Sequence, residues 1–359
     1  MNTPTVSIVM SVLNGERFLH EALDSLLRQT FTDFEVLVVN DGSTDCTRQI
    51  LDHYSAADSR VQVIHQQNQG LVASLNLGCG RATGKYIARM DADDVSLPDR
   101  LERQVAFCEA HPAIGVAGGA IELIDAGGRS HGTSRNPTSD SAIRAGLARG
   151  GTPLWHPTVM MRRDVWRAAG GYRKAFVDAE DFDLWLRIAE RHPLANLESI
   201  VLRYRLHASQ VSVRKYRQQV LSNVAARLSA EARKQGRPDP FEDRVEAITE
   251  ALLVSLGAER KTLQSAMARS LLSCISNMRD AGEQEIAARA LKELRSLDWP
   301  YVEVAIRADM HLLESRLLWR QGHRREGLQA AWRAVQARPR IVGRPLKVLF
   351  QRLRMVPAY

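Results

Sequence analysis

Several features that would mark other classes of protein are missing from this sequence. The 359-residue chain holds only four cysteines, Cys46, Cys79, Cys108 and Cys274, and no two of them form a CxxC pair. This scattering argues against a disulfide framework and against a zinc site, and we expect the four thiols to be reduced. No apolar run reaches the roughly 18 residues of a membrane span, and the N-terminus shows no basic segment followed by an apolar core. We therefore expect a globular protein that stays in the cytoplasm.

Acidic residues are scarce toward the C-terminal end of the chain. Residues 216–359 carry 25 Lys and Arg against 16 Asp and Glu, a net charge of +9, whereas the rest of the chain carries 24 against 25, a net charge of −1. Residues 316–359 alone hold 11 basic residues against the single acid Glu326. So uneven a split indicates at least two functional regions. We predict a first domain at residues 1–214 and a helical region with a basic tail at residues 215–359.

Strands and helices are expected to alternate through the N-terminal part of the chain. Apolar stretches rich in β-branched residues, as buried strands require, occur at residues 5–13, 34–39, 61–65 and 85–90. Between them, apolar residues three and four positions apart predict helices. This alternation predicts an α/β fold with helices on both faces of a sheet, and a ligand site beyond the carboxyl ends of the strands. Asp41 and Asp91 both fall at such ends.

The remaining chain is expected to add two strands and then become helical. Residues 114–124 and 156–163 predict strands, and residues 125–153 have the composition of a glycine-rich loop region. From about Val213 onward, apolar positions three and four apart predict helices alone. Residues 309–340 resemble one helix–turn–helix unit of a tetratricopeptide-type repeat. A general helical domain is the alternative.

Three aspartates close together follow one of the predicted strands, in the sequence YIARMDADD at residues 86–94. In an extended segment alternate side chains share a face, so Asp91 and Asp93 are expected to point together and Asp94 elsewhere. Carboxylates held this close repel each other, and a divalent cation relieves the repulsion; oxygen ligands favour Mg²⁺ or Mn²⁺ over Zn²⁺. The alternative is a solvated acidic loop that stabilises the start of the following helix.

Three blocks of sequence together resemble the family 2 glycosyltransferases of the GT-A fold. They are the stretch from VSIVMSVLNGERF to NDGSTD, the stretch NQGLVASLNLGCGRATGKYIARMDADD, and the stretch AEDFDLWLRIA, and the likeness extends from residue 5 to about residue 212. It implies a Rossmann-like mixed sheet with helices on both faces, followed by an all-α C-terminal region. It also implies an inverting transferase that moves a sugar from a nucleoside diphosphate sugar, here expected to be UDP-linked, to a hydroxyl acceptor.

The resemblance assigns donor-binding roles to residues that match the family's motifs. Asp41 would contact the nucleobase, with Ser11 and Leu13 in the wall beside it. Asp91 would bind the ribose, and Asp93 would bind the metal, Mg²⁺ or Mn²⁺. Leu13 stands where many relatives carry an aromatic residue, so stacking on the base is expected to differ in this chain.

The resemblance also assigns roles on the acceptor side. Asp181 matches the general base that deprotonates the acceptor hydroxyl, and Glu180 is an acceptor-binding or supporting carboxylate. His207 would approach the diphosphate or the metal. Without the resemblance, Glu180 and Asp181 could equally stabilise the positive end of the helix that begins there, and a single buried histidine is more often structural than catalytic.

The expected partners are a nucleoside diphosphate sugar and a glycan or lipid-linked acceptor, as in the synthesis of a bacterial cell-surface polysaccharide or glycolipid. The basic tail could lie on the inner face of an anionic membrane, making the protein peripheral there, or could dock on the first domain. No nucleic-acid recognition motif is present, so nucleic acid is not expected. The rival functions are a nucleotidyltransferase that makes a sugar nucleotide and a non-catalytic carbohydrate- or partner-binding relative.

Overall fold

The computed structural model describes residues 3–207, 213–242, 247–280, 284–320 and 322–338 of the chain. The chain divides into two compact units. The first joins Met1–Gln210 with Leu221–Ile248, and the second joins Val211–Val220 with Thr249–Tyr359. The boundary expected between residues 214 and 215 falls inside helix α8 (Val213–Lys234) and stays a prediction.

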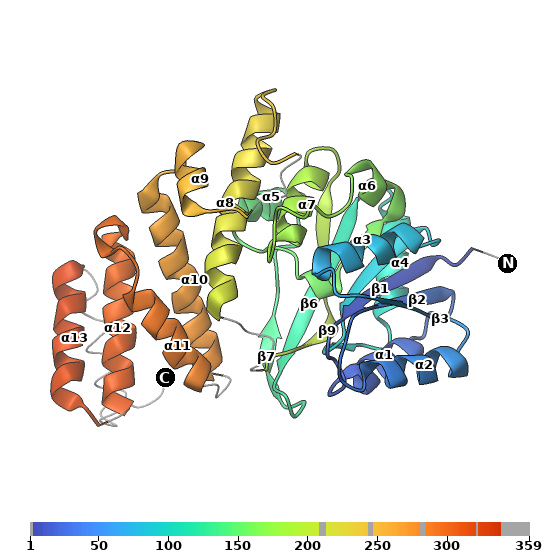
Figure 1. Cartoon of the computed structure of the whole chain (residues 1–359), viewed down its shortest axis with the longest axis horizontal. Coiled ribbons are helices and arrows are strands. Elements are labelled where there is room, and N and C mark those ends of the chain that lie inside the picture. Colours follow the sequence, from blue (N-terminus) through green and yellow to red (C-terminus); the bar gives the residue numbers. More distant parts are fainter. Residues whose placement is uncertain (1–2, 208–212, 243–246, 281–283, 321, 339–359) are drawn as a thin grey trace. The chain divides into compact units, whose positions relative to one another are not determined.

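A mixed sheet forms the centre of the first unit (Figure 1). Its strands are β1 (Val6–Val12), β2 (Phe34–Asp41), β3 (Val61–Gln66), β4 (Tyr86–Asp91), β5 (Val95–Ser96), β6 (Val116–Ile124), β7 (Ser130–Ser134), β8 (Met160–Arg162) and β9 (Leu194–Arg205). They lie in the order β3-β2-β1-β4-β8-β6-β9-β5, with β7 paired to β6. The first four strands pair in parallel, whereas β8 runs antiparallel to both of its neighbours. The predicted α/β fold with a mixed sheet is confirmed.

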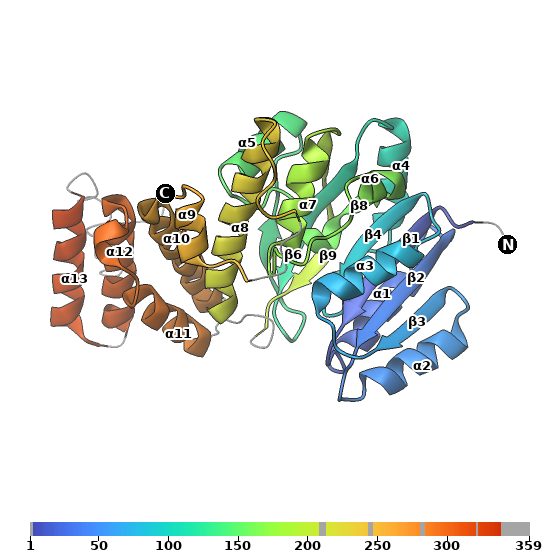
Figure 2. The same cartoon turned by 45° about the horizontal axis from the view of Figure 1, so that its top comes forward.

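Helices cover both faces of this sheet, as predicted (Figure 2). They are α1 (Leu19–Leu27), α2 (Thr47–Ala57), α3 (Leu71–Arg81), α4 (Arg100–Ala110), α5 (Asp140–Ala148), α6 (Arg163–Ala168) and α7 (Glu180–Ala189). On one face, alternate strand residues such as Ile8 and Ala88 form a buried core with Leu23 of α1 and Leu101 of α4. On the other face α3 packs directly on β1 and β2. Helix α3 comes so close that an added Cβ at Gly78 would lie 2.6 Å from the Val9 side chain.

Two parts of the sheet differ from the sequence prediction. Residues 125–153, expected to be a loop region, contain β7 and α5, and the segment predicted as a strand at 156–163 begins with a 3₁₀ turn, His156–Thr158, before β8. The twelve-residue strand β9 was not predicted at all. Its charged residues do not fit the apolar pattern by which buried strands are predicted from sequence. In the sheet these charges find partners on the neighbouring strand: Arg203 donates to Glu122 of β6 at 3.0 Å.

A buried ion network ties α7 to the part of the first unit that follows α8. Asp183 of α7 is fully buried and pairs with Arg173 and with Arg187, the latter at 2.8 Å. Arg173 also pairs with Asp239 at 2.8 Å. This pair joins the two chain segments of the first unit, because Asp239 belongs to the segment 221–248 and Arg173 to the segment that carries the sheet. The network therefore fixes the position of the α7 N-terminus, where Glu180 and Asp181 lie.

We expect Asp183→Asn to destabilise the first unit by about 3 to 5 kcal/mol, because two buried guanidinium groups lose their shared counter-ion. Chemical denaturation monitored by tryptophan fluorescence measures the change. Asp164→Asn is the matched control: Asp164 pairs with Arg162 at the surface, and an exposed ion pair is worth less than about 1 kcal/mol. Equal losses in the two variants would contradict the structural role of the Asp183 network.

The second unit is helical throughout its described part. It contains the N-terminal end of α8, then α9 (Glu250–Ser255), α10 (Arg260–Asp280), α11 (Gln284–Arg295), α12 (Val304–Arg320) and α13 (Arg324–Ala337). Helices α12 and α13 form a hairpin that turns at Gly322, whose φ of +87° favours glycine, and they pack through Ala308, Leu312 and Ala334. The predicted all-α C-terminal region is confirmed, and its likeness to a tetratricopeptide repeat stays a prediction.

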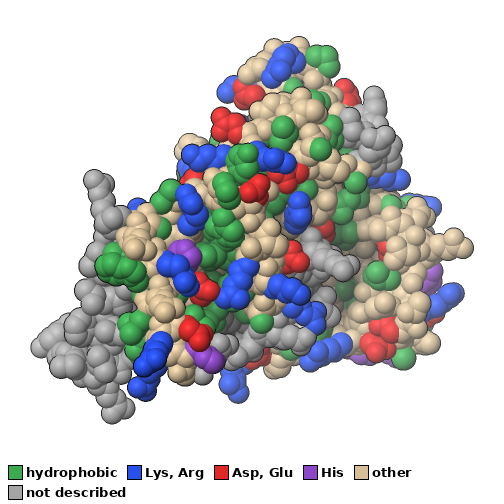
Figure 3. Space-filling view, turned by 60° about the vertical axis from the view of Figure 1, so that its left-hand side comes forward, with side chains coloured by type: hydrophobic (Ala, Val, Ile, Leu, Met, Phe, Trp, Pro, Cys, Tyr) green, Lys and Arg blue, Asp and Glu red, His purple; other side chains and the backbone are tan. Residues whose placement is uncertain are grey.

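On the face that Figure 3 shows, Lys and Arg side chains lie among hydrophobic and acidic ones. Within the described residues, no helix combines the length and the apolar content that crossing a bilayer demands. The end of the basic tail, RPLKVLFQRLRMVPAY at residues 344–359, to which we assigned a possible membrane contact, lies outside the described residues.

Candidate active site

The predicted donor-binding residues gather where parallel strands of the sheet end. The register of β1 with β4 places Ser11 beside Asp91. The register of β1 with β2 places Val12, the last residue of β1, beside Asn40. Leu13 therefore follows the end of β1, level with Asp41, the last residue of β2. Leu13 is half exposed, which leaves its side chain available to a ligand. The structure thus brings four of the predicted residues to one edge of the sheet, as expected for strand ends in an open α/β sheet.

Two loops at this edge are joined by hydrogen bonds from backbone N–H groups to side-chain oxygens. The side-chain oxygen of Asn14 accepts the N–H of Thr44 at 2.8 Å, and the Asn14 N–H donates to the hydroxyl of Ser43 at 2.9 Å. Gly42 has a φ of +78°, and a Cβ there would lie 2.7 Å from the backbone nitrogen of Asn68. Only glycine fits at position 42, where the chain passes close to Asn68. The loops after β1 and β2 therefore hold each other in place beside the strand ends.

Asp41 is buried and already hydrogen-bonded on both oxygens. Its Oδ1 accepts the N–H of Gln69 at 2.8 Å, and its Oδ2 accepts the N–H of Gly70 at 2.9 Å. The carboxylate thereby fixes the loop that leads into α3, at the helix N-terminus. The predicted contact of Asp41 with a nucleobase stays a prediction. The hydrogen bonds show that Asp41 holds the loop before α3 in place beside the strand ends.

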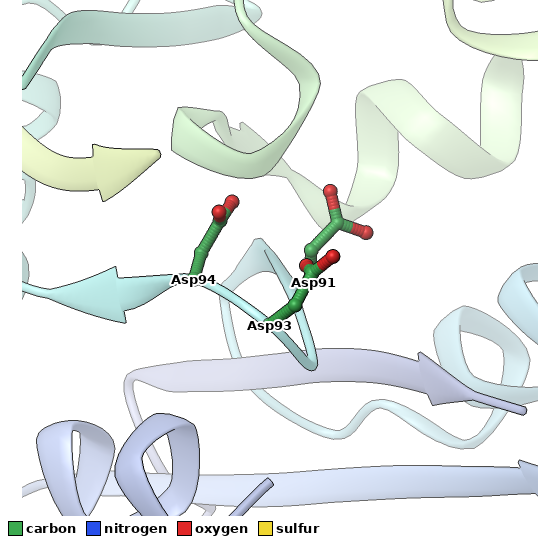
Figure 4. A group of neighbouring side chains, drawn as sticks. All are labelled: Asp91, Asp93 and Asp94. Carbon is green, nitrogen blue, oxygen red and sulfur yellow. The ribbon is translucent and has the colours of Figure 1, made fainter. Parts of the chain in front are cut away.

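The three aspartates form one cluster in the turn after β4 (Figure 4). One carboxylate oxygen from each of Asp91, Asp93 and Asp94 lies within 4.8 Å of the others. The expectation that Asp94 points elsewhere is wrong, because residues 92 and 93 form a turn and the chain is not extended there. Asp94 is fully buried, and its Oδ1 accepts the backbone N–H of Arg205 at 2.9 Å. Burial, with repulsion from Asp91 and Asp93, raises the pKa of Asp94 well above its ordinary value.

The cluster fits a hard divalent cation. Its donors are carboxylate oxygens alone, the set that Mg²⁺ and Mn²⁺ prefer, and the second oxygen of Asp94 is buried without a hydrogen-bond partner among the described residues. His207 reaches the same place: its Nε2 lies 2.9 Å from Oδ2 of Asp93, and its ring packs on Phe18 with the centroids 4.9 Å apart. The structure therefore joins the two predicted metal residues, Asp93 and His207, in one contact.

A second pair of carboxylates stands at the N-terminus of α7. Glu180 is buried and Asp181 is partly buried, and Oδ1 of Asp181 accepts the N–H of Phe182 at 2.7 Å. Burial raises the pKa of Asp181 to about 6, although the Phe182 N–H and the charge of Arg89 oppose the rise. Burial and repulsion from Asp181 raise the pKa of Glu180 to about 8. At neutral pH Asp181 is thus an ionised carboxylate with unusual basicity, and Glu180 holds a proton.

Sequence reasoning missed three residues beside these carboxylates. Arg89 of β4 is 4 % exposed and pairs through Nη2 with Oδ1 of Asp91. Its one available signal was a charge inside an apolar strand. His156 lies with Nδ1 3.9 Å from Oε1 of Glu180 and with Nε2 2.9 Å from the hydroxyl of Tyr172. Burial and the charge of Arg89 hold the pKa of His156 well below its usual range, so this histidine is neutral.

The arrangement supports two kinds of chemistry in one site. The carboxylates after β4 can hold a cation and, through it, an anionic phosphate group. The carboxylate of Asp181, with a pKa close to neutral, can accept a proton.

Comparison with known proteins agrees with the geometry of this site. The sequence profile of Glycosyl transferase family 2 matches residues 7–169. The chain is 41% identical over 191 residues to the putative glycosyltransferase EpsE of Bacillus subtilis, covering 52% of this chain and 67% of that one. It is 33% identical over 207 residues to the O-antigen biosynthesis glycosyltransferase WbnJ of Escherichia coli, covering 56% of this chain and 80% of that one.

Solved structures match nearly the whole chain in fold. TarS residues 1–349 of S. aureus, in complex with UDP-GlcNAc, superposes with a TM-score of 0.51 at 16% identity and covers 92% of each chain. The mannosyltransferase PcManGT of Pyrobaculum calidifontis, in complex with GDP-Man and Mn²⁺, superposes with a TM-score of 0.50 at 17% identity, covering 94% of this chain and 86% of that one. These neighbours confirm the GT-A type of fold, and the alternative of a nucleotidyltransferase is not favoured. The sequence relatives show that the chain belongs to glycosyl transferase family 2.

Proposed function

We propose that this protein is an inverting, metal-dependent glycosyltransferase that moves a hexosyl-type sugar from a UDP-linked donor to a hydroxyl acceptor. The observation that carries the proposal is a carboxylate cluster suited to a cation after β4, together with a second, basic carboxylate at the start of α7. A nucleotide-sugar donor is supported by the fold neighbours in complex with UDP-GlcNAc and with GDP-Man, and UDP is the nucleotide that we propose.

On the donor side, the residues at the strand ends hold the nucleotide. Leu13 offers an exposed apolar surface for the base, Ser11 lies beside it, and Asp41 fixes the loop that leads into α3. Asp91 binds the ribose, and Asp93 is the principal ligand of Mg²⁺ or Mn²⁺. A divalent cation bound there would neutralise the charge that grows on the departing diphosphate.

On the metal side, His207 positions Asp93 through the contact at 2.9 Å, and it reaches the diphosphate or the cation when a donor is present. A histidine that holds a carboxylate ligand in place restricts its rotation and lowers the entropy lost on binding.

On the acceptor side, Asp181 removes the proton of the attacking hydroxyl. A carboxylate is a weak base for a free alcohol, but the hydroxyl becomes acidic as its oxygen bonds to the sugar carbon, so placement of the base matters first. Attack from the side opposite the diphosphate inverts the configuration at that carbon. Glu180, protonated at neutral pH, supports Asp181 by donating a hydrogen bond to the acceptor.

This assignment predicts a bell-shaped dependence of turnover on pH. Activity should rise with pH as Asp181 loses its proton near pH 6, and fall again as Glu180 loses its proton near pH 8 and places a second negative charge beside the base. Initial rates at saturating Mn²⁺ between pH 5 and pH 9, on the order of one point per half unit, check this. In Glu180→Gln the alkaline limb should disappear and the acid limb remain; an unchanged alkaline limb would contradict the role of Glu180.

The acceptor is proposed to be a glycan or lipid-linked intermediate of a cell-surface polysaccharide. The name of the relative WbnJ supports this class. The basic residues of the tail suit a peripheral contact with an anionic membrane, which would bring the enzyme to a lipid-linked acceptor on the cytoplasmic side.

A panel of UDP-, GDP- and dTDP-sugars tests the function most simply. The purified chain is incubated with each sugar and Mn²⁺, and release of the nucleoside diphosphate is followed with and without a mixture of lipid-linked oligosaccharides. Release from a single class of donor, increased by an acceptor, is the expected result. A protein that releases no nucleotide from any donor, yet binds glycans, would favour the non-catalytic alternative.

A further inference from the structure

Arg205, the last residue of β9, is among the largest side chains that the fold buries completely. It lies next to residues 91–94, the turn after β4 that carries the three aspartates and is called the aspartate turn below. Strand β5 follows this turn directly and pairs antiparallel with β9, with Val95 opposite Arg203. Because the two chains of an antiparallel pair run in opposite directions, this register puts Arg205 level with Asp93. The end of β9 therefore runs beside the aspartate turn.

Two hydrogen bonds join Arg205 to the aspartate turn. Its backbone N–H donates to Oδ1 of Asp94 at 2.9 Å, and its Nε donates to the backbone oxygen of Asp93 at 2.8 Å. The first bond fixes the side chain of one aspartate, and the second fixes the main chain that carries another. Residues that hold the ligands of a metal in place in this way tune the affinity of the site.

The guanidinium of Arg205 is itself held from several sides. Its Nη2 pairs with Glu21 of α1, and its Nη1 donates to the backbone oxygen of Asp125 at 3.3 Å. Together with the bond from Nε to Asp93, these contacts give every nitrogen of the guanidinium a partner. A buried polar network that is fully bonded is rigid, so Arg205 can serve as a fixed support for the turn.

The same guanidinium is connected to His207 through one aromatic ring. The guanidinium carbon of Arg205 lies 4.6 Å from the centroid of the Phe18 ring, and the ring of His207 packs on Phe18 with the centroids 4.9 Å apart. Nε2 of His207 in turn lies 2.9 Å from Oδ2 of Asp93. Arg205 therefore holds the main chain of Asp93 directly and its carboxylate through Phe18 and His207.

We propose that Arg205 is a positioning residue that holds the aspartate cluster in the geometry that a divalent cation requires. The inference rests on the proposed function, in which Asp93 is a ligand of the cation. An arginine has no acceptor atom to offer a cation, so Arg205 acts through Asp93 and Asp94. Its removal should consequently weaken binding of the cation, and weaken binding of the nucleotide only where that binding depends on the cation.

The variant Arg205→Met removes the hydrogen bonds of the guanidinium and keeps much of its volume. The Mn²⁺ concentration that gives half-maximal binding of UDP, measured by calorimetry, should rise between about tenfold and a hundredfold. Additional Mn²⁺ should restore UDP binding, and the UDP affinity in excess EDTA should equal that of the wild type. Arg205→Lys keeps the charge but not the fork geometry, and it should show a smaller rise.

Arg203→Met is the matched control on the same strand. Arg203 pairs with Glu122 of β6 at 3.0 Å and donates to the backbone oxygen of Gly128 in the loop after β6. Its Mn²⁺ requirement should therefore match that of the wild type, and chemical denaturation shows how much stability each variant loses. Two results would overturn the inference: an equal rise in Arg203→Met and Arg205→Met, or a loss of UDP affinity in Arg205→Met that is the same with Mn²⁺ and in EDTA.

A second pair of variants keeps the test decisive if Arg205→Met does not fold. Glu21→Gln removes the ion pair that anchors the guanidinium, and the Glu21 side chain is exposed enough for the fold to tolerate the change. Glu21→Gln and Arg205→Lys should each raise the Mn²⁺ requirement at least about threefold, and the double variant should show less than the product of the two effects. A wild-type Mn²⁺ requirement in both single variants would overturn the inference.

The inference and the proposed function fail in different ways. If the wild-type protein binds UDP equally well with Mn²⁺ and in EDTA, the metal dependence of the proposed function is overturned, and the role of Arg205 with it. If the wild-type protein needs Mn²⁺ and the Arg205 variants have the same Mn²⁺ requirement, only the role of Arg205 is overturned.

Discussion

Asp181→Asn should lower sugar transfer by about a thousandfold, equivalent to about 4 kcal/mol of transition-state stabilisation, while nucleotide binding stays unchanged. The substitution removes the proton acceptor but preserves shape. The side-chain oxygen of Asn can still accept the Phe182 N–H that Asp181 now accepts at 2.7 Å, so the start of α7 should keep its conformation. Steady-state rates measure the loss, and calorimetric titration of UDP measures the binding.

The companion variant Asp164→Asn makes the same chemical change in a surface ion pair and should retain full activity. Two outcomes would contradict the assignment of the base. One is transfer within about tenfold of the wild type, since a general base contributes at least a hundredfold. The other is an equal loss of UDP binding, which would show that Asp181 serves the fold or the donor instead.

Asp93→Asn should weaken Mn²⁺ binding on the order of a hundredfold, and with it the donor affinity. A cation held by a few carboxylate oxygens loses both charge and a ligand when one of them becomes an amide. The affinity of UDP should fall only when Mn²⁺ is present, because the effect passes through the cation. Titrations of UDP over a range of Mn²⁺ concentrations separate the two equilibria.

The Mn²⁺ affinity of a His207 variant shows whether His207 binds the cation directly or only orients its ligand Asp93. His207→Ala should weaken Mn²⁺ binding between about tenfold and a hundredfold if the imidazole only holds Asp93 in place, as the 2.9 Å contact suggests. Asp99→Asn is the control in the same region, because Asp99 pairs with Arg103 at the surface of α4. For the Asp93 variant, a Mn²⁺ affinity equal to that of the wild type would show that Asp93 is not a ligand of the metal.

The place of the donor-binding residues at the carboxyl ends of the strands could be predicted, because each strand is marked by the composition of a short stretch of sequence. The apolar stretch before Leu13 and the stretch before Asp91 each show a buried strand by composition alone, and parallel strands bring their carboxyl ends together. The position of Asp94 could not be predicted in the same way. A turn at residues 92 and 93, which depends on the contact of Asp94 with Arg205 more than a hundred residues away, replaces the extended chain that alternation assumes.

The part played by Arg89 could not be predicted for a similar reason. Arg89 matters through its burial and through its charge, which acts on Asp91 and His156, and neither can be read from the strand in which it stands. Strand β9 was missed because its charged residues find partners only after it pairs with β6. Local composition predicts which elements form, whereas the charge balance of the site is set by contacts distant in sequence.

The central claim is that the aspartate cluster after β4 binds the donor's diphosphate through a divalent cation. Isothermal titration calorimetry of the UDP-sugar identified by the donor panel, once with Mn²⁺ and once with excess EDTA, tests it most directly. We predict binding with Mn²⁺ that weakens at least about a hundredfold in EDTA, because two anions would then face each other without a counter-charge. Equal affinity under both conditions would contradict the claim.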